Sequence, residues 1–222
     1  MKSNFSSPID HQVLPDKIVD FIRDQIITGK LKAGVKVSEA KLSDELHISR
    51  TPIREAIRLL ECEGFIEIIP RKGAVVKEFS KKDIINTFEV KAAIEALAVK
   101  DAAPLLEERD LNKLKQIIAN EENYYNAKQI VKAFKEFDQF TSILIKKCSN
   151  QLLLDMNMKM TNHIVRYRFF CFKFPSIMDN VTDSHKKLLS LVEQKRFNEL
   201  RFEYESYYME IGKKMADIIS SL

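Results

Sequence analysis

Two arginines on one predicted helix are the side chains whose type and spacing first suggest a chemistry. At 100° per residue, Arg54 and Arg58 share a helical arc with Thr51. The roughly opposite arc carries apolar residues, namely Ile53, Ala56, Ile57 and Leu60. A guanidinium group pairs with guanine edges and clamps phosphates, so the arginine face suits nucleic acid. The alternative is a solvated helix face, which is the usual role of arginines spaced four residues apart.

Polar and cationic residues on either side of this helix point to the same chemistry. Ser49 and Thr51 stand at its N-terminal end, where hydroxyls and free backbone N–H groups suit phosphate oxygens. Arg71, Lys72 and Gly73 fall in a predicted turn, and the two cations can approach a DNA backbone or minor groove from there. These two segments extend the candidate DNA-binding surface beyond the arginine helix.

The elements that must position these residues follow one another in the order of a winged helix-turn-helix. Apolar spacing, an N-cap at Ser38 and a stop at Gly29 set the predicted helix bounds. A tight turn over 47–49 precedes the arginine-bearing helix, and Pro52 is tolerated in its first turn. The predicted elements are helices over 16–28, 39–46 and about 50–64, then a β-hairpin with strands over 65–69 and 74–76.

Composition divides the chain into two predicted domains. The 222 residues are 45% hydrophobic and 31% charged, so the chain can bury a core and is not disordered. Four of the five glycines lie within residues 15–79, and the remainder follows helical patterns. We predict a winged helix-turn-helix domain over residues 11–79 and an all-helical domain over residues 80–222. The predicted fold class is mainly α, with a small β-hairpin wing and a C-terminal antiparallel all-α helical bundle.

The helical domain is predicted to open with a capping-box pattern at Ser80 to Asp83. Its first helix ends before Pro104. Further helices are predicted at about 110–126, 129–148, 150–174, 183–194 and 197–220.

Several classes of protein are disfavoured by what the sequence lacks. Cys62, Cys148 and Cys171 are too scattered for a disulfide framework or a zinc motif, and are typical of reduced thiols in a cytoplasmic protein. No apolar run approaches a membrane span, and the N-terminus has no apolar signal-peptide core. No nucleophile–base signature, glycine-rich phosphate loop or paired metal motif supports an enzyme. We therefore expect a cytoplasmic protein that is neither an enzyme nor bound to a membrane.

The first domain resembles the DNA-binding domain of the GntR family. The similarity covers residues 31–66, with Ser49-Arg50-Thr51-Pro52 followed by Arg54-Glu55-Ala56 as its most specific part, and the wing over 70–76. His47 stands where the family usually has glycine in the turn. Histidine tolerates left-handed backbone better than most residues, so the turn is expected to survive.

This resemblance implies a dimeric, DNA-binding transcription regulator and assigns roles by position. Arg50 and Arg54 would read bases or phosphates, and Ser49 and Thr51 would hold phosphates. Lys72 and Gly73 would enter the minor groove. With Arg58 from the helical arc, the predicted DNA-binding residues are Ser49, Arg50, Thr51, Arg54, Arg58, Lys72 and Gly73.

The helical segment resembles the C-terminal domain of the FadR-type branch of the GntR family. Residues 90–95 match its opening helix, although Lys91 replaces the usual arginine. Phe140, Leu144 and Asn150 match the pattern of its fourth helix, and His185 matches a histidine that opens a later helix. The resemblance implies a domain that binds a small effector.

That domain commonly holds a divalent metal through one aspartate and three histidines, and the metal helps to grip a carboxylate effector. The corresponding positions here are Phe137, Thr141, His185 and Tyr207, so one ligand in four remains. The segment has two histidines, His163 and His185, which cannot supply three imidazoles. We therefore predict no family-type metal site and no cofactor.

Side chains that would replace the metal are the candidates for binding an effector. The predicted effector-binding residues are Asp138, Thr141, Asn162, Arg166, His185 and Tyr207. A buried arginine needs an anion, so Arg166 favours an acidic effector. Alternatively, Tyr207 is part of the core and Arg166 pairs with a carboxylate of the protein itself.

Together these features predict a homodimeric, sequence-specific regulator, a repressor rather than an activator, that binds a double-stranded DNA operator. Two copies of the arginine helix would enter successive major grooves of a near-palindromic site. A small organic effector in the helical domain would control binding. The alternatives are a DNA-binding dimer without an effector and an enzyme in the helical domain.

Overall fold

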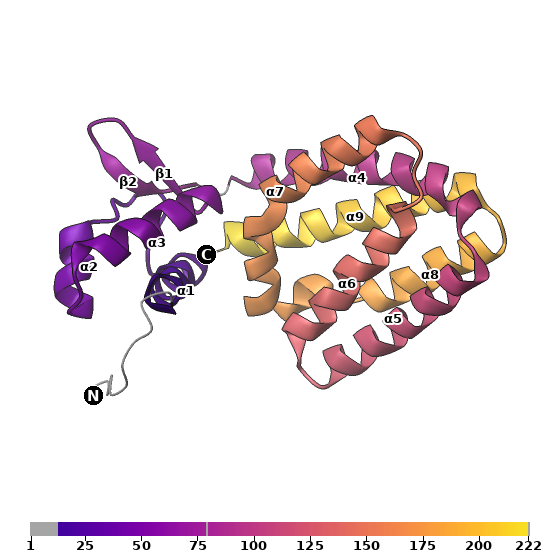
Figure 1. Ribbon diagram of the computed structural model, residues 1–222, viewed down its shortest axis with the longest axis horizontal. Coiled ribbons are helices and arrows are strands. Elements are labelled where there is room, and N and C mark those ends of the chain that lie inside the picture. Colours follow the sequence, from indigo (N-terminus) through magenta and orange to yellow (C-terminus); the bar gives the residue numbers. More distant parts are fainter. Residues whose placement is uncertain (1–12, 79, 222) are drawn as a thin grey trace. The chain divides into compact units, whose positions relative to one another are not determined.

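The computed structural model describes residues 13–78 and 80–221, apart from the side chains at 13, 14, 162, 163, 165 and 168 (Figure 1). The chain divides into two compact units, and the second begins at Ser80. Of the predicted sites, Asn162 is a side chain outside this description. Each unit is considered separately below.

The first unit is a three-helix head with a two-stranded wing, as predicted. Its helices are α1 (Val13–Ile27), α2 (Glu39–Leu46) and α3 (Arg50–Cys62), and its strands are β1 (Ile66–Ile69) and β2 (Gly73–Val76). The strands pair antiparallel, with Ile66 opposite Val76. Ser38 caps α2 by accepting a hydrogen bond from the Lys41 N–H, and His47 adopts the left-handed conformation with φ 55°. The predicted N-cap and the predicted turn are therefore both present.

An apolar stripe on α3 and a partly buried ion pair hold the head together. Ile53, Ala56 and Leu60 are fully buried, which confirms the predicted inward arc. Arg23 of α1 binds the Glu63 carboxylate just after α3 through Nη2–Oε1 and Nη2–Oε2, both 2.8 Å. Because these contacts join the first helix to the end of the third, they fix the direction in which α3 presents its outer face.

The second unit is an all-helical bundle whose elements lie close to the predicted ranges. They are α4 (Lys81–Ala102), the 3₁₀ turn η1 (Ala103–Leu105), α5 (Glu108–Asn126), α6 (Ile130–Ile145), α7 (Gln151–Lys173), the 3₁₀ turn η2 (Pro175–Met178), α8 (Val181–Glu193) and α9 (Phe197–Ser220). Helices α4 and α9 lie side by side in Figure 1 and make the most extensive pairing of the unit. Among the described helices, none combines the length and hydropathy that a membrane span needs.

One glycine lets α4 and α9 approach closely. A Cβ atom at Gly212 of α9 would lie 2.5 Å from the Cβ of Phe88, which is closer than real Cβ contacts. Phe88 is buried and also meets the ring of Tyr208 at 5.7 Å between centroids. The only glycine of the helical domain therefore has a packing role, as expected of a glycine in a helix interior.

A buried carboxylate joins the start of α5 to the end of α6. Asp110 accepts hydrogen bonds from the Glu107 N–H at 3.0 Å and from Lys146 Nζ at 2.6 Å, with Lys147 Nζ at 3.1 Å. The Lys146 ammonium and the Glu107 N–H together hold the pKa of Asp110 far below its usual range. The charged form of Asp110 is thus preferentially stabilised in the folded protein.

Replacing Asp110 by asparagine is expected to lower the free energy of unfolding by about 1.5–3 kcal/mol, because charge-assisted hydrogen bonds are lost. The folded pKa is depressed, so this contribution is complete above the unfolded pKa of roughly 4 and is lost as the pH falls toward the folded pKa. Urea unfolding followed by tyrosine fluorescence measures it, because all six tyrosines lie in the helical domain. Asp217→Asn, in an exposed pair with Lys81, is the control. If both variants lost the same free energy of unfolding at pH 7, the stabilising role of the Asp110 carboxylate would be contradicted.

Candidate nucleic-acid interface and ligand cavity

The outer face of α3 is a cluster of exposed polar and cationic side chains. Arg54 and Arg58 are exposed on the face opposite the buried stripe, as their spacing predicts. Ser49, Arg50 and Thr51 are exposed around the helix start, and Ser49 makes no capping hydrogen bond within the described residues. The structure therefore brings all five predicted residues of this segment onto one accessible surface.

Arg54 has a partner that its spacing does not reveal. Its Nε lies 2.6 Å from Oε2 of Glu39, the first residue of α2, and the arginine side chain is 61% exposed. The ion pair orients the guanidinium group across the gap between the two helices of the motif. Exposed pairs of this kind contribute about 0–1 kcal/mol, so Arg54 can exchange Glu39 for a phosphate or base edge at little cost.

The tip of the wing presents two cations. Arg71, in the left-handed conformation with φ 67°, and Lys72 are exposed in the turn between β1 and β2. Gly73 is the first residue of β2, half-buried and paired with Ile69, so it lies at the base of the turn. Its φ of 86° explains the need for glycine there.

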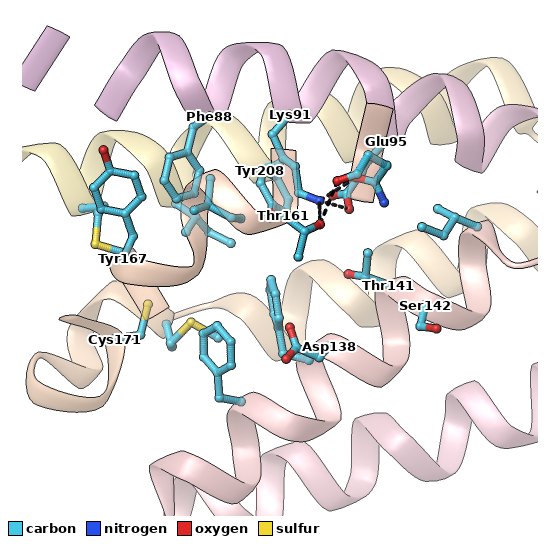
Figure 2. A pocket seen from close by; sticks show the side chains of 18 residues that line it. Phe88, Lys91, Glu95, Asp138, Thr141, Ser142, Thr161, Tyr167, Cys171 and Tyr208 are labelled. Atoms are coloured by element: carbon cyan, nitrogen blue, oxygen red, sulfur yellow. Dashed lines mark hydrogen bonds and ion pairs between the residues drawn. The ribbon is translucent and has the colours of Figure 1, made fainter. Parts of the chain in front are cut away.

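The helical unit contains a cavity of about 290 Å³ between α4, α6, α7 and α9 (Figure 2). Most of its described wall is aromatic or aliphatic, including Phe88, Phe137, Ile164 and Tyr208. Figure 2 shows Asp138 and Thr141 directed from α6 into this space, opposite Lys91 of α4. Apolar walls with a few convergent polar groups are typical of small-molecule sites.

A buried polar cluster forms one side of the cavity. Lys91 Nζ donates to Glu95 Oε1 at 2.8 Å, to Asn157 Oδ1 at 2.5 Å and to Thr161 Oγ1 at 2.7 Å. The other Glu95 oxygen accepts from the Tyr204 hydroxyl at 2.9 Å. Lys91 and Glu95 are each 2% exposed. Burial, with the Glu95 charge adding to it, raises the pKa of Tyr204 well above its usual range, so this hydroxyl remains a donor.

A second buried network contains His185. Its Nδ1 lies 2.9 Å from Glu121 Oε2, and its Nε2 lies 2.8 Å from the Tyr207 hydroxyl. A carboxylate accepts, so Nδ1 is the donor to Glu121. Burial, reinforced by the Glu121 charge, raises the pKa of Tyr207 well above its usual range, so its hydroxyl keeps the proton that it can donate to Nε2. Phe140 stacks on the imidazole with ring centroids 3.8 Å apart.

The structure separates the predicted effector residues into two groups. Asp138 and Thr141 line the cavity, whereas His185, Tyr207 and Arg166 are not among its described lining residues. Hydrogen bonds hold His185 and Tyr207 in the network with Glu121, so the expectation that they share one effector site with Thr141 stays a prediction.

Arg166 does not supply the buried cation that favoured an acidic effector. It is half-buried and its Nη2 donates to the Tyr167 hydroxyl at 2.8 Å. Its guanidinium carbon also lies 4.8 Å from the centroid of the Tyr167 ring. The guanidinium group is therefore engaged by a side chain of the protein itself.

Comparison with known families identifies both units. The family described as bacterial regulatory proteins, gntR family, matches residues 14–76, and the FCD domain family matches residues 86–201. The chain belongs to the GntR family. The two matches correspond to the head and to the helical unit.

Relatives of this GntR-family chain carry names of transcription regulators. The HTH-type transcriptional repressor RspR of Escherichia coli (strain K12) is 24% identical over 215 residues, covering 97% of this chain and 92% of that protein. The gluconate operon transcriptional repressor of Bacillus licheniformis is 39% identical over 74 residues, or 33% of this chain and 30% of that protein. Family and relatives thus point to regulation of transcription rather than to catalysis.

Solved structures share the fold of the GntR-family chain. The protein Lar, which controls the expression of the Listeria monocytogenes agr system, matches with a TM-score of 0.67 at 19% identity, covering 99% of this chain and 100% of that chain. E. coli McbR/YncC matches with a TM-score of 0.58 at 18% identity, covering 94% and 97%. These likenesses support a winged helix-turn-helix head followed by a helical domain.

The residues of this GntR-family chain do not fit the divalent metal that FCD domains often hold. Phe137 stands at the aspartate position, and its ring lies 5.6 Å from the His185 ring. Both ring nitrogens of His185 are already engaged by Glu121 and Tyr207, so neither offers a lone pair to a metal. Among the described residues, no group of three His, Cys, Asp or Glu side chains is arranged to hold a metal.

The sequence analysis did not predict the buried polar cluster around Lys91 in the cavity of this GntR-family chain. The signal that points to it is the Lys91–Glu95 spacing of four residues, which also occurs on solvated helix faces. Asn157 and Thr161 lie on one face of α7 at the same spacing, but nothing in the sequence connects them to Lys91.

Proposed function

We propose that this GntR-family chain is a homodimeric transcriptional repressor that binds a DNA operator through α3 and the wing, and whose helical domain binds a small organic effector. The observation that carries the proposal is the exposed arginine face of α3 within the head that the gntR family matches over residues 14–76. The proposed DNA-binding residues are Ser49, Arg50, Thr51, Arg54, Arg58, Lys72 and Gly73.

The division of roles follows from position on the interface. Arg54 and Arg58, in the middle of the exposed face, are placed to reach base edges in a major groove. Ser49 and Thr51 stand by the free N–H groups of the helix start, which favours phosphate oxygens. Lys72 at the wing tip is a charge for the neighbouring backbone or minor groove.

Selection of bound duplexes from a random DNA library, with the purified full-length protein, tests the proposal. We expect a near-palindromic consensus, because each subunit of a homodimer reads one half-site. Affinity for that duplex should fall with salt, with a log–log slope of about −5 if each of two heads neutralises three phosphates. Failure to enrich a consensus, or a flat salt response, would overturn the proposal.

The proposed regulator works without a resident metal. The residues at the family's metal-ligand positions support this. Both ring nitrogens of His185 are engaged in hydrogen bonds, and Phe137 and Tyr207 stand at two of the other ligand positions. Dialysis against a chelator is expected to leave both the melting temperature and the operator affinity unchanged. A stoichiometric transition metal in the purified protein, lost together with DNA binding, would contradict this expectation.

The effector acts by preferring one arrangement of the two heads in the dimer. A ligand that binds both arrangements equally shifts nothing, so its contacts must differ between them. Asp138 and Thr141 are the proposed contacts on the cavity wall, while His185, Tyr207 and Arg166 support it from outside the described lining. Because its target is an operator, the regulator acts where the chromosome lies, in the cytoplasm.

A further inference from the structure

We propose that Asn157 selects the effector, which is an amphipathic molecule whose hydrogen-bond-accepting head meets Asn157 and whose apolar tail runs along α7. This inference rests on the proposed function, because it names the chemical class of the effector and its direction in the cavity. Two observations carry it: an oriented side-chain amide on the cavity wall, and a row of apolar residues that leads away from it along the same helix.

Lys91 fixes the orientation of the Asn157 amide. The Lys91 Nζ lies 2.5 Å from one end of the amide, and because an ammonium group can only donate, that end is the oxygen Oδ1. Lys91 is itself held by Glu95 at 2.8 Å, and both of these side chains are 3% exposed or less. The NH₂ group of Asn157 therefore points away from Lys91, which acts as a positioning residue.

The amide nitrogen of Asn157 is a donor that a ligand can reach. The residue lines the cavity and is 8% exposed. Within the described part of the chain, its side chain is bonded through Oδ1 and not through the nitrogen. The nitrogen keeps accessible surface, because it is not one of the fully enclosed side-chain atoms that lack a partner among the described residues. An oxygen of a ligand would satisfy this largely buried donor.

The other polar groups around Lys91 are already paired within the protein. Glu95 accepts from Lys91 through one oxygen and from the Tyr204 hydroxyl, at 2.9 Å, through the other. The Thr161 hydroxyl accepts from Lys91 at 2.7 Å and donates its proton to the backbone carbonyl of Asn157 at 2.9 Å. This cluster thus offers the cavity a donor, the Asn157 amide, so it favours a ligand head that accepts hydrogen bonds.

A change of polarity along α7 gives the ligand its direction. On the cavity wall, Asn157 and Thr161 are followed by Ile164, Tyr167 and Cys171, at spacings of three or four residues that keep all five on one face of the helix. Figure 2 shows Tyr167 and Cys171 well to one side of Thr161. About 21 Å of helix separates Asn157 from Cys171. An extended apolar tail fits this wall, with the accepting head at Asn157.

Three probes of similar length that differ in the head test the class: 2-heptanone only accepts hydrogen bonds, hexanoate accepts and is charged, and protonated hexylamine only donates. Calorimetric titration into the full-length protein is expected to show binding of an acceptor, and the tighter of the two identifies the head as a neutral or an acidic carbonyl. Hexylamine should bind at least about fivefold more weakly, the effect of one donor left unpaired. Tighter binding of hexylamine, or no binding of any probe, would overturn the inference.

Asn157→Asp should reverse the preference. Aspartate keeps an oxygen for Lys91 and replaces the NH₂ group by an acceptor, so 2-heptanone should bind about 2- to 13-fold more weakly while hexylamine binds more tightly. Asn112→Asp, at an exposed position of α5 outside the described lining, is the matched control and should change neither affinity. Equal weakening of every probe by Asn157→Asp would mean a purely structural role and refute the assignment. If the variant did not fold, the comparison of probes on the unaltered protein would still decide the head.

The direction of the tail is tested with 2-alkanones of increasing length, from 2-butanone to 2-octanone. Each methylene that enters the apolar end should raise affinity by up to about fourfold, the effect of burying one CH₂ group. Cys171→Met places a longer side chain at that end, so it should weaken binding of 2-octanone and leave 2-butanone unchanged. Equal effects on both ketones, or affinity that does not rise with length, would contradict the proposed direction. No DNA is present in these titrations, so they can succeed while operator selection fails, or the reverse.

Discussion

Arg54→Ala is expected to weaken binding of the selected operator by roughly 5- to 150-fold, the equivalent of about 1–3 kcal/mol for one arginine that reads a base. The residue lies on the exposed face of α3, opposite the fully buried Ile53, Ala56 and Leu60. Removing its side chain therefore removes the proposed contact to DNA and leaves the core of the head unchanged.

The same substitution should hardly affect stability. The Arg54–Glu39 pair is exposed, with 61% and 36% of the two side chains accessible, and such pairs contribute about 0–1 kcal/mol. Electrophoretic mobility shift or fluorescence anisotropy gives the affinity, and a thermal melt gives the stability. Arg109→Ala is the control, because Arg109 is an exposed arginine paired with Glu107 in the helical domain. If Arg54→Ala and Arg109→Ala bound the operator with equal affinity, Arg54 would not be part of the DNA interface.

A substitution at Glu39 tests the Arg54–Glu39 ion pair from the other side. Glu39→Gln releases the guanidinium group and removes a negative charge from the surface next to the DNA, so affinity should hold or rise. If Glu39→Gln weakened binding as strongly as Arg54→Ala, the ion pair would be positioning Arg54 rather than competing with DNA for it.

The head is the part of this molecule that its sequence predicts best. Its signals are local: an apolar arc on α3, an N-cap at Ser38, and a turn at His47 are each specified within a few residues. Local signals of this kind agree with the final fold because the head packs short, neighbouring elements. The partner of Arg54 lay 15 residues away and gave no periodic signal.

The cavity was predicted less well, because its polar groups are joined over long sequence separations. Lys91 meets Asn157 and Thr161 across 66 and 70 residues, and His185 meets Glu121 across 64. Positions equivalent to metal ligands drew attention to His185 and Tyr207, but could not show that a hydrogen-bond network engages them. Periodicity predicts which face of a helix is buried, not which polar side chains meet inside the bundle.

Lys91→Met is expected to cause the largest loss of stability, about 3–5 kcal/mol, because it leaves the Glu95 carboxylate buried without its cation. Glu95 is 2% exposed and would keep one hydrogen bond, from Tyr204. Asn157 and Thr161 would lose their donor at the same time. Urea unfolding followed by tyrosine fluorescence isolates the helical domain, which holds all six tyrosines.

A charge-matched double variant separates the buried charge from the lost packing. In Lys91→Met/Glu95→Gln the uncompensated carboxylate is gone and the amide oxygen still accepts from Tyr204, so most of the loss should be recovered. Lys100→Met, an exposed lysine on the same helix, should leave stability unchanged. If the double variant were as unstable as Lys91→Met, the loss would come from the hydrogen bonds to Asn157 and Thr161. The hydrogen bonds from Lys91 to α7 would then matter more for stability than the compensation of the Glu95 charge.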